Sequence, residues 1–242
     1  MGRLRSKRRN HNNDESPEKS RVVKKPFEIK TIEPLTNAQS ETFNEYEKNQ
    51  NLLLIGSPGT GKTFLSLYLA LNEVINTKSQ YKKVVIVRSV VPTREMGFLP
   101  GNLKEKIKVY EAPYYGICSE LFGRDDAYDI LKQKNLIEFI STSHVRGITI
   151  KNSIVIVDEG QNLSAHESDS IITRLHKTSK IIFCGDLKQT DFTKHSDRQG
   201  FVDFIRILKK LHQFSNINFT YDDIVRGSLI KDYIIAKESL DI

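Results

Sequence analysis

The segment GSPGTGKT, at residues 56–63, constrains the fold of this chain more than any other stretch. It satisfies the pattern GxxxxGK[ST], and it lies between an apolar run at 51–55 and a helical stretch at 64–75. In that position, a glycine-rich loop turns successive backbone N–H groups towards phosphate oxygens at the N-terminus of a helix. An incidental glycine-rich turn is the alternative, and the flanking pattern disfavours it. The sequence therefore predicts a P-loop domain that binds a nucleoside triphosphate.

The residues of this loop differ in their expected roles. Gly56, Gly59 and Gly61 permit backbone conformations that are closed to other residues. Lys62 is expected to bring positive charge to the β- and γ-phosphates, and Thr63 to offer its hydroxyl to Mg²⁺. The residues of this segment expected to contact ATP are Gly56, Ser57, Pro58, Gly59, Thr60, Gly61, Lys62, Thr63 and Phe64.

Short apolar runs alternate with helical stretches after residue 26, which is typical of an α/β protein. Runs that are apolar on consecutive residues indicate strands covered on both faces, and hence a mostly parallel sheet. The expected fold is a single RecA-like P-loop NTPase domain over 27–242, with helices on both faces of the sheet. The expected strands lie at 51–55, 84–88, 136–141, 153–158, 180–185 and 217–221.

The net charge of +7 comes mainly from the start of the chain. Residues 1–25 hold nine Lys or Arg and three Asp or Glu, which gives +6 and leaves +1 for the remainder. We expect 1–26 to be a disordered basic leader, because its side chains bury too little apolar surface to offset the entropy of ordering. An electrostatic arm for RNA or DNA and a solvated leader are both open readings of it.

The lengths of the hydrophobic runs and the spacing of the cysteines indicate in which cellular compartment the protein is expected. No apolar run approaches the roughly 18 residues that span a bilayer, so no membrane association is expected. Cys118 and Cys184 are far apart and lack CxxC spacing, so neither a disulfide framework nor a zinc site is predicted. The cytoplasm is the expected location.

Two carboxylates end the apolar run within SIVIVDEGQN, at 153–162. Open α/β sheets gather their ligands at the carboxyl ends of strands. Asp158 is expected to hold Mg²⁺ together with Thr63, and Glu159 to polarise the attacking water as general base. A common surface turn is the alternative for an isolated Asp-Glu pair, and the upstream P-loop disfavours it.

The run KIIFCGDLKQTD, at 180–191, ends in a similar way. Gly185, Asp186 and Gln189 fit a loop beside the γ-phosphate, with Gln189 placed to sense it. For Asp186 alone, a helix-capping role is the better interpretation.

The order of these motifs resembles the PhoH family of P-loop ATPases, whose core is similar to that of superfamily 1 helicases. The resemblance runs from about Thr31 to Lys237, and it implies ATP hydrolysis with Mg²⁺ and a role in RNA or DNA metabolism. It is carried by GSPGTGKT, MGFLPGNLKEKI (96–107), PYY (113–115), HVRGITIKNSIVIVDEGQN (144–162), ITRLHKTSKIIFCGDLKQTDF (172–192) and DIVRGSLI (223–230).

Three positions depart from the family pattern. Gly160 stands where the family usually has alanine, Ile148 replaces an arginine, and Leu175-His176-Lys177 replaces expected glycines. The change at 148 weakens any transfer of a nucleic-acid contact to that loop.

Gln39 has two interpretations. By resemblance, helicase-like ATPases use a glutamine in this region to contact adenine. The TxxQ spacing of Thr36 and Gln39 equally fits a capping box, in which both side chains satisfy helix-end N–H groups. Ser164 and Glu167 repeat this spacing, and there we predict the capping box.

A guanidinium is expected to stabilise the charge that develops during phosphoryl transfer. Arg146, Arg174 and Arg226 are candidates, with a surface salt bridge as the alternative for each. By resemblance, Arg226 looks like the helicase arginine that reaches ATP across an interface.

Basic and aromatic residues alternate in the middle of the chain, as in grooves that bind single strands. Internal packing is the alternative for the tyrosines. The candidates are Arg88, Arg94, Lys104, Lys106, Lys108, Tyr110, Tyr114 and Tyr115.

Helicases of the resembled kind use two RecA-like lobes, whereas 27–242 accommodates one. We therefore predict a homo-oligomer with ATP at subunit interfaces, acting on single-stranded RNA or DNA. The alternative is a nucleotide-dependent switch that recruits a protein partner.

Overall fold

The computed structural model describes residues 27–90, 103–187 and 195–240, with the side chains of 103–106, 195–198 and 238 left aside. Several sequence predictions lie outside this part: the leader at 1–26, Arg94, Gln189, and the side chains of Lys104 and Lys106. The strands are β1 (Asn51–Gly56), β2 (Lys83–Arg88), β3 (Ile137–Ser141), β4 (Ser153–Val157), β5 (Lys180–Gly185) and β6 (Phe214–Phe219).

The strands form one six-stranded sheet in the order β3-β2-β4-β5-β1-β6, and every neighbouring pair is parallel. Helices connect and cover them. Their bounds are α1 (Asn37–Glu47), α2 (Lys62–Ile75), α3 (Leu103–Phe122), α4 (Ala127–Gln133), α5 (Thr142–Val145), α6 (Ala165–Arg174), α7 (His195–Leu208) and α8 (Ser228–Ser239), with short 3₁₀ turns η1 (Gly160–Asn162) and η2 (Tyr221–Asp223).

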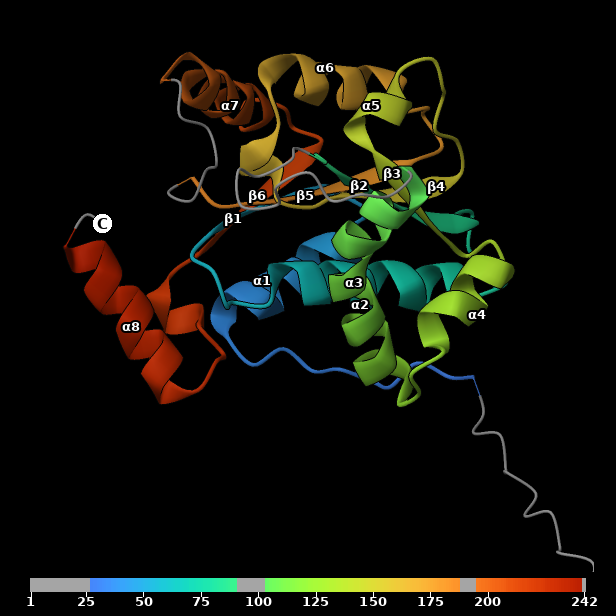
Figure 1. Cartoon of the computed structure of the whole chain (residues 1–242), viewed down its shortest axis with the longest axis horizontal. Helices are drawn as coiled ribbons and strands as arrows, with labels where there is room; N and C mark the ends of the chain where they lie inside the picture. Colours follow the sequence, from blue (N-terminus) through green and yellow to red (C-terminus); the bar gives the residue numbers. More distant parts are fainter. Residues whose placement is uncertain (1–26, 91–102, 188–194, 241–242) are drawn as a thin grey trace, which may run out of the picture.

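Two apolar clusters lie on opposite faces of the sheet. Leu52 and Leu54 of β1 belong to the cluster under α1 to α4, whereas Leu53 and Ile55 belong to the cluster under α5 to α7. Figure 1 shows α1 to α4 below the sheet and α5 to α7 above it. This alternation explains the consecutive apolar runs, since neighbouring residues of a strand face different helical layers. The predicted α/β sheet, covered on both faces, is confirmed.

The position of the last strand differs from the prediction. The sequence suggested 217–221, whereas β6 runs over Phe214–Phe219 and pairs with β1 from Asn51↔Phe214 to Gly56↔Phe219. Within its second half, Ile217 and Phe219 are buried and Asn218 is exposed. This outer strand therefore alternates in polarity, which hid its first half from a search for continuous apolar runs.

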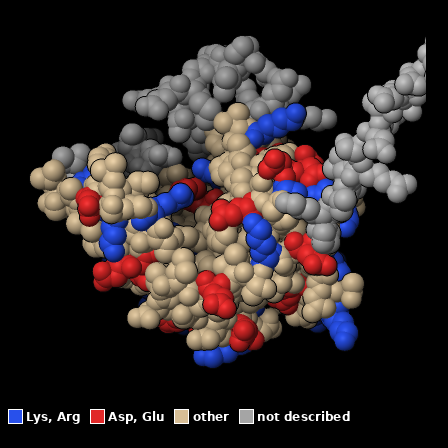
Figure 2. Space-filling model, turned by 90° about the horizontal axis from the view of Figure 1, so that it is seen from below, with Lys and Arg blue, Asp and Glu red and all other residues tan. Residues whose placement is uncertain are grey.

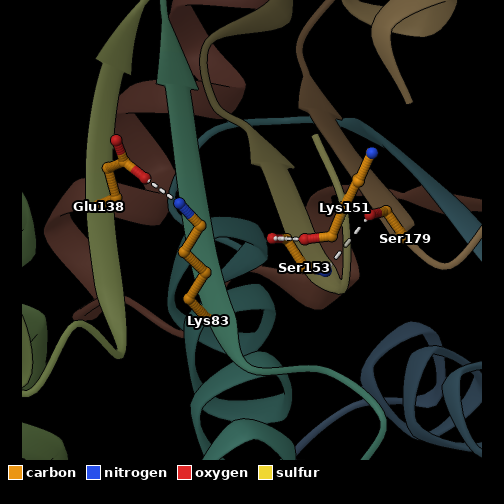
Figure 3. Close-up of polar contacts among 5 residues, drawn as sticks. All are labelled: Lys83, Glu138, Lys151, Ser153 and Ser179. Atoms are coloured by element: carbon orange, nitrogen blue, oxygen red, sulfur yellow. Dashed lines mark hydrogen bonds and ion pairs between the residues drawn. The ribbon is translucent and has the colours of Figure 1, made fainter. Parts of the chain in front are cut away.

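The two ends of the sheet differ in their polar contacts. At the amino ends, Lys83 pairs with Glu138, and the Ser153 hydroxyl donates to the Lys151 carbonyl at 2.7 Å (Figure 3). The Ser153 amide donates to the Ser179 hydroxyl at 3.3 Å. These contacts hold the beginnings of the strands, and the carboxyl ends carry the predicted site.

Helix α8 stands to one side of the two layers (Figure 1). It exposes Leu229, Ile230 and Tyr233 by 80%, 48% and 66%. None of the described helices is both long and apolar enough to cross a bilayer.

Candidate nucleotide site

The P-loop joins β1 to α2 through backbone that excludes side chains. A Cβ at Gly56 would lie 1.8 Å from the Phe219 carbonyl oxygen, which also accepts a hydrogen bond from the Ser57 amide at 3.1 Å. Gly61 precedes α2 in the left-handed region, with φ 87°, and supplies no side-chain cap. The first N–H groups of α2 therefore face the loop without a capping side chain, as an anion site requires.

Lys62 folds back onto its own loop. Its Nζ donates to the carbonyls of Gly56 and Ser57 at 2.8 and 2.7 Å, and to Thr60 Oγ1 at 3.3 Å. Burial lowers the pKa of Lys62, and the carboxylates nearby, including Asp186, act in the opposite direction. The ammonium group is thus held at the loop by contacts that phosphate oxygens can replace.

Thr60 turns its side chain into the loop, and its expected contact with ATP stays a prediction. Its side chain is fully buried, and its hydroxyl donates to the Ser57 carbonyl at 3.0 Å. The side chain of Thr60 therefore braces the loop and does not face the cavity.

Asp158 follows β4 and lies across from Thr63. Thr63 Oγ1 donates to Asp158 Oδ1 at 2.6 Å, and the Tyr114 hydroxyl donates to Oδ2 at 2.8 Å. Among the described residues, no group of three or more His, Cys, Asp or Glu could hold a metal. Mg²⁺ commonly takes one or two protein oxygens and completes its shell with water and phosphate. The hydroxyl of Thr63 and the carboxylate of Asp158 fit that demand.

Glu159 has an unusual backbone for its residue type, with φ 53° in the left-handed region. Its Oε2 accepts a hydrogen bond from Gln161 Nε2 at 2.6 Å. Burial and the neighbouring Asp158 raise the pKa of Glu159, while Arg88, Gln161 and Lys62 counteract the shift. A strained backbone therefore presents a carboxylate that retains affinity for a proton, as a general base needs.

Gln161 joins two strands, and sequence reasoning missed it. Its Oε1 accepts from the backbone N–H of Asp186 at 3.0 Å while its Nε2 reaches Glu159, so it connects the ends of β4 and β5. Its place in DEGQN was visible. Its contact with Asp186 could not be predicted, because that contact depends on the order of strands in the sheet.

Gly160 fits tightly beside the sheet. A Cβ here would lie 2.2 Å from the Phe183 ring, and Phe183 is fully buried. The departure from the alanine of the family pattern is thus matched by a bulky neighbour on β5.

A cavity of about 330 Å³ brings the predicted groups together at the carboxyl ends of β1, β4 and β5. That volume lies within the range of small-molecule sites. The expected residues that line it are Pro58, Gly59, Gly61, Lys62, Thr63, Phe64, Asp158, Glu159, Gly185, Asp186 and Arg226. Unexpected lining comes from Ile117, Glu120, Gln161 and Cys184.

Gln39 is buried and bound to the P-loop. Its Nε2 donates to the Thr60 carbonyl at 3.1 Å, and its Oε1 accepts from the Leu35 amide at 2.8 Å. Thr36 caps α1 by accepting from the Gln39 amide, which agrees with half of the capping-box alternative, while Gln39 itself accepts from Leu35 and not from Thr36. The adenine contact of Gln39 stays a prediction. Ser164 and Glu167 form the complete capping box that the sequence indicated.

Arg226 lies beside the P-loop of its own chain. Its Cγ is 3.0 Å from the position of a Cβ on Gly59, and the neighbouring Val225 amide donates to the Gly59 carbonyl at 3.2 Å. Arg174 lies at the opposite end of the sheet, where its carbonyl accepts from Ile150 just before β4. Arg146 is exposed beyond α5 and is not part of the cavity lining.

The aromatic groove predicted from the sequence is wrong for Tyr114, and Tyr115 is only partly exposed. Tyr114 is fully buried against Asp158, and Tyr115 packs on Tyr128 with ring centroids 4.3 Å apart. The Tyr114 ring is therefore not available for stacking on a base.

The basic residues of that predicted groove differ in their exposure to solvent. Arg88 is half-buried near the Tyr110 ring, and Lys108 is exposed. Burial opposes the charge on Arg88, but Tyr114, Asp158 and Glu159 outweigh it and raise the pKa of Arg88.

Comparisons with known proteins agree with the motifs. The family described as PhoH-like protein matches residues 31–238. A PhoH-like protein of Bacillus subtilis is 33% identical over 86% of this chain, and one of Synechocystis is 30% identical over 90%. The chain spans 64% and 65% of these two relatives, a little under two thirds of their length.

Solved structures give more distant similarities. The large terminase of a thermophilic bacteriophage has a TM-score of 0.49 and 12% identity, covering 83% of this chain and 50% of its own. The Hef helicase domain of Pyrococcus furiosus has a TM-score of 0.44 and 11% identity, covering 78% and 40%. Similarities at this level concern the fold alone.

Proposed function

Because the chain belongs to the PhoH family, we propose that residues 27–242 form an ATPase that requires Mg²⁺. One observation carries the proposal: Thr63 and Asp158 meet in front of an uncapped helix N-terminus, with Lys62 and Glu159 in the same cavity. A phosphate chain requires this combination of N–H groups, one ammonium group and a metal-binding pair.

Each group of the cavity then has a role. Lys62 exchanges the carbonyls of Gly56 and Ser57 for phosphate oxygens, and Thr63 and Asp158 hold the metal. Mg²⁺, when bound, supplies positive charge that stabilises the charge spreading over the transferred phosphoryl group. Glu159 accepts a proton from the attacking water, while Gln161 orients its carboxylate.

Arg226 completes this proposal as an arginine supplied by the same chain. Its place beside Gly59 supports action within one subunit, in contrast to the expected action across an interface. A guanidinium near the phosphates stabilises charge in either arrangement.

We further propose a homo-oligomer that acts on single-stranded RNA or DNA in the cytoplasm. The exposed apolar residues of α8 adjoin the cavity through Val225 and Arg226, which supports a second copy packing there. The family resemblance supports the nucleic-acid role. Figure 2 shows acidic and basic groups interspersed on the face it displays, so charge on that face gives this role no added support.

A nucleotide-dependent switch that binds a protein partner is the second candidate. The same α8 surface favours it, since exposed apolar side chains suit a protein interface better than a phosphate backbone.

ATP turnover with and without homopolymer RNA or DNA, at two salt concentrations, tests the proposal. Stimulation that weakens with salt supports the nucleic-acid role, and turnover indifferent to nucleic acid supports the switch. Lys62→Ala and Glu159→Gln variants that turn over ATP normally would refute the site. Light scattering with ATP and Mg²⁺ tests the oligomer, and a monomer with full turnover contradicts it.

A further inference from the structure

Helix α3 sends one fully buried side chain to the metal-binding carboxylate. The Tyr114 hydroxyl donates to Asp158 Oδ2 at 2.8 Å, while Thr63 occupies Oδ1 at 2.6 Å. Each carboxylate oxygen thus accepts from one hydroxyl, while the Arg88 guanidinium interacts with the Tyr114 hydroxyl and adds positive charge near Asp158. Neutral donors fix the direction of a carboxylate without cancelling the charge that attracts a cation, whereas an ammonium or guanidinium in the same place competes with the cation.

We propose that Tyr114 is a positioning residue that holds Asp158 in the orientation that binds Mg²⁺ and ties α3 to the nucleotide site. This inference rests on the proposed function. It concerns a residue for which the sequence suggested only stacking or packing.

The surroundings of Tyr114 keep its hydroxyl in this role. Its ring packs against Phe139 of β3, with centroids 5.9 Å apart, so the aromatic ring is held by the core.

The face of α3 that carries Tyr114 also reaches the cavity. Ile117 and Glu120, three and six residues further along, line the cavity beside the P-loop. Pro113 removes one backbone donor directly before Tyr114, so the first half of α3 is bound less tightly to the turn that holds the hydroxyl. The Tyr114 hydroxyl therefore links the part of α3 that follows Pro113 to Asp158.

Tyr128 provides a matched control within the same layer. It is also fully buried, and its hydroxyl donates to the buried Glu111 at 3.1 Å. That pair lies between α3 and α4 and is not part of the cavity lining. Tyr114→Phe and Tyr128→Phe each remove one hydroxyl from a buried carboxylate, and only the first touches the metal-binding pair.

The test is a Mg²⁺ titration of fluorescent ATP binding, together with thermal unfolding. We expect Tyr114→Phe to lower the apparent affinity for Mg²⁺ in this titration about tenfold. This is the lower end of the range observed when a hydrogen-bond partner of a metal ligand is removed. Binding in EDTA should not change. Tyr128→Phe should lower the unfolding temperature by a similar amount and leave the Mg²⁺ titration as in wild type.

Equal Mg²⁺ titrations for Tyr114→Phe and wild type would overturn the inference and leave the ATPase proposal standing. Wild-type protein that shows no Mg²⁺-dependent binding would overturn both. If Tyr114→Phe does not fold, 3-fluorotyrosine at position 114 keeps the hydroxyl. Its ¹⁹F signal at saturating ATP should then move with Mg²⁺ in an otherwise wild-type chain and stay still in Asp158→Asn. A signal that ignores Mg²⁺ in both proteins would also overturn the inference.

Discussion

Two lysines at opposite ends of the sheet both have a pKa that burial lowers, but they contact different groups. At the carboxyl end, Lys62 is half-buried and its ammonium touches three loop oxygens. At the amino end, Lys180 is 3% exposed, donates to the Tyr46 carbonyl at 2.8 Å and lies 3.6 Å from the centre of the Tyr46 ring. Burial lowers the pKa of both. A lowered pKa therefore does not distinguish the lysine proposed to bind phosphate from the lysine packed on Tyr46; their hydrogen-bond partners do.

The backbone shows the same contrast. Left-handed non-glycine residues precede β1, β3 and β4 at the amino end, and all three are asparagines: Asn49, Asn135 and Asn152. Asparagine tolerates this conformation, whereas the glutamate at 159 does not do so readily. At the amino end, the left-handed positions are held by asparagines, which tolerate that conformation. At the carboxyl end, the strained residue is Glu159, which lies in the candidate nucleotide site.

The largest expected effect comes from Lys62→Ala. Removing the ammonium should lower kcat/KM for ATP by about 1000-fold, the upper part of the range for losing one preorganised donor. Steady-state turnover measures it. Lys180→Met is the control at the other end of the sheet, and an equal loss of turnover there would end the distinction between the two lysines.

The next effect concerns stability and pH. Burial lowers the pKa of Lys180 to about 8, and Glu73 only partly counteracts the shift. The unfolded chain, with an ordinary lysine, binds more protons between pH 8 and 10.5, so this group makes folding more favourable as pH rises through that window. Across this pH window, the contribution of Lys180 to the free energy of unfolding changes by on the order of 3 kcal/mol.

Urea unfolding of wild type and Lys180→Met, compared from about pH 7 to about pH 9.5, isolates this contribution. The surrounding titratable groups, Tyr46, Glu73 and Tyr81 with Lys177 and His212 on the same hollow, are common to both proteins. Wild type should gain stability relative to the variant as pH rises. A constant difference would show that Lys180 is not desolvated in solution.

A third effect tests packing at the carboxyl end. Gly160→Ala restores the residue of the family pattern, but its Cβ would meet the Phe183 ring. We expect a loss of about 2 kcal/mol, typical of overpacking, measured by urea unfolding. Gly116→Ala is the control, because α3 leaves open space around that position; it should gain up to about 1 kcal/mol. A stable Gly160→Ala variant would mean that Phe183 moves freely.

The smallest effect concerns Gln161. Replacing it with Leu removes the donor to Glu159 and the acceptor for Asp186. We expect kcat to fall about tenfold with little change in KM, since a hydrogen bond to a carboxylate is worth on the order of 1.5 kcal/mol. Full activity would show that Glu159 keeps its orientation through its backbone alone.

The parts of the site that the sequence predicts are short local motifs, whereas the parts that it does not predict are contacts between residues far apart in the chain. GSPGTGKT and the Asp158-Glu159 pair follow from local pattern, because a phosphate loop and a strand-end carboxylate are set by their own neighbours. The Gln161 bridge to Asp186 and the Tyr114 bond to Asp158 join separate elements. Their existence depends on strand order and on how α3 packs, which no local pattern contains.

The fold shows a similar division. Five strands follow the expected runs, and four of them, β1, β2, β4 and β5, are apolar on consecutive residues. The outer strand β6 alternates in polarity, and its beginning at Phe214 was missed. The position of Arg226 beside its own P-loop was also beyond reach, since it depends on η2 turning the chain back towards Gly59.

That return of the chain has a consequence for biosynthesis. The P-loop leaves the ribosome long before β6 and η2, yet Ser57 is bonded to Phe219, and Gly59 to Val225. A growing polypeptide therefore carries the phosphate-binding segment well before it carries the strand and turn that hold it. We therefore expect nucleotide binding only after those segments have emerged, and we expect a product truncated before β6 to keep the motif without binding ATP.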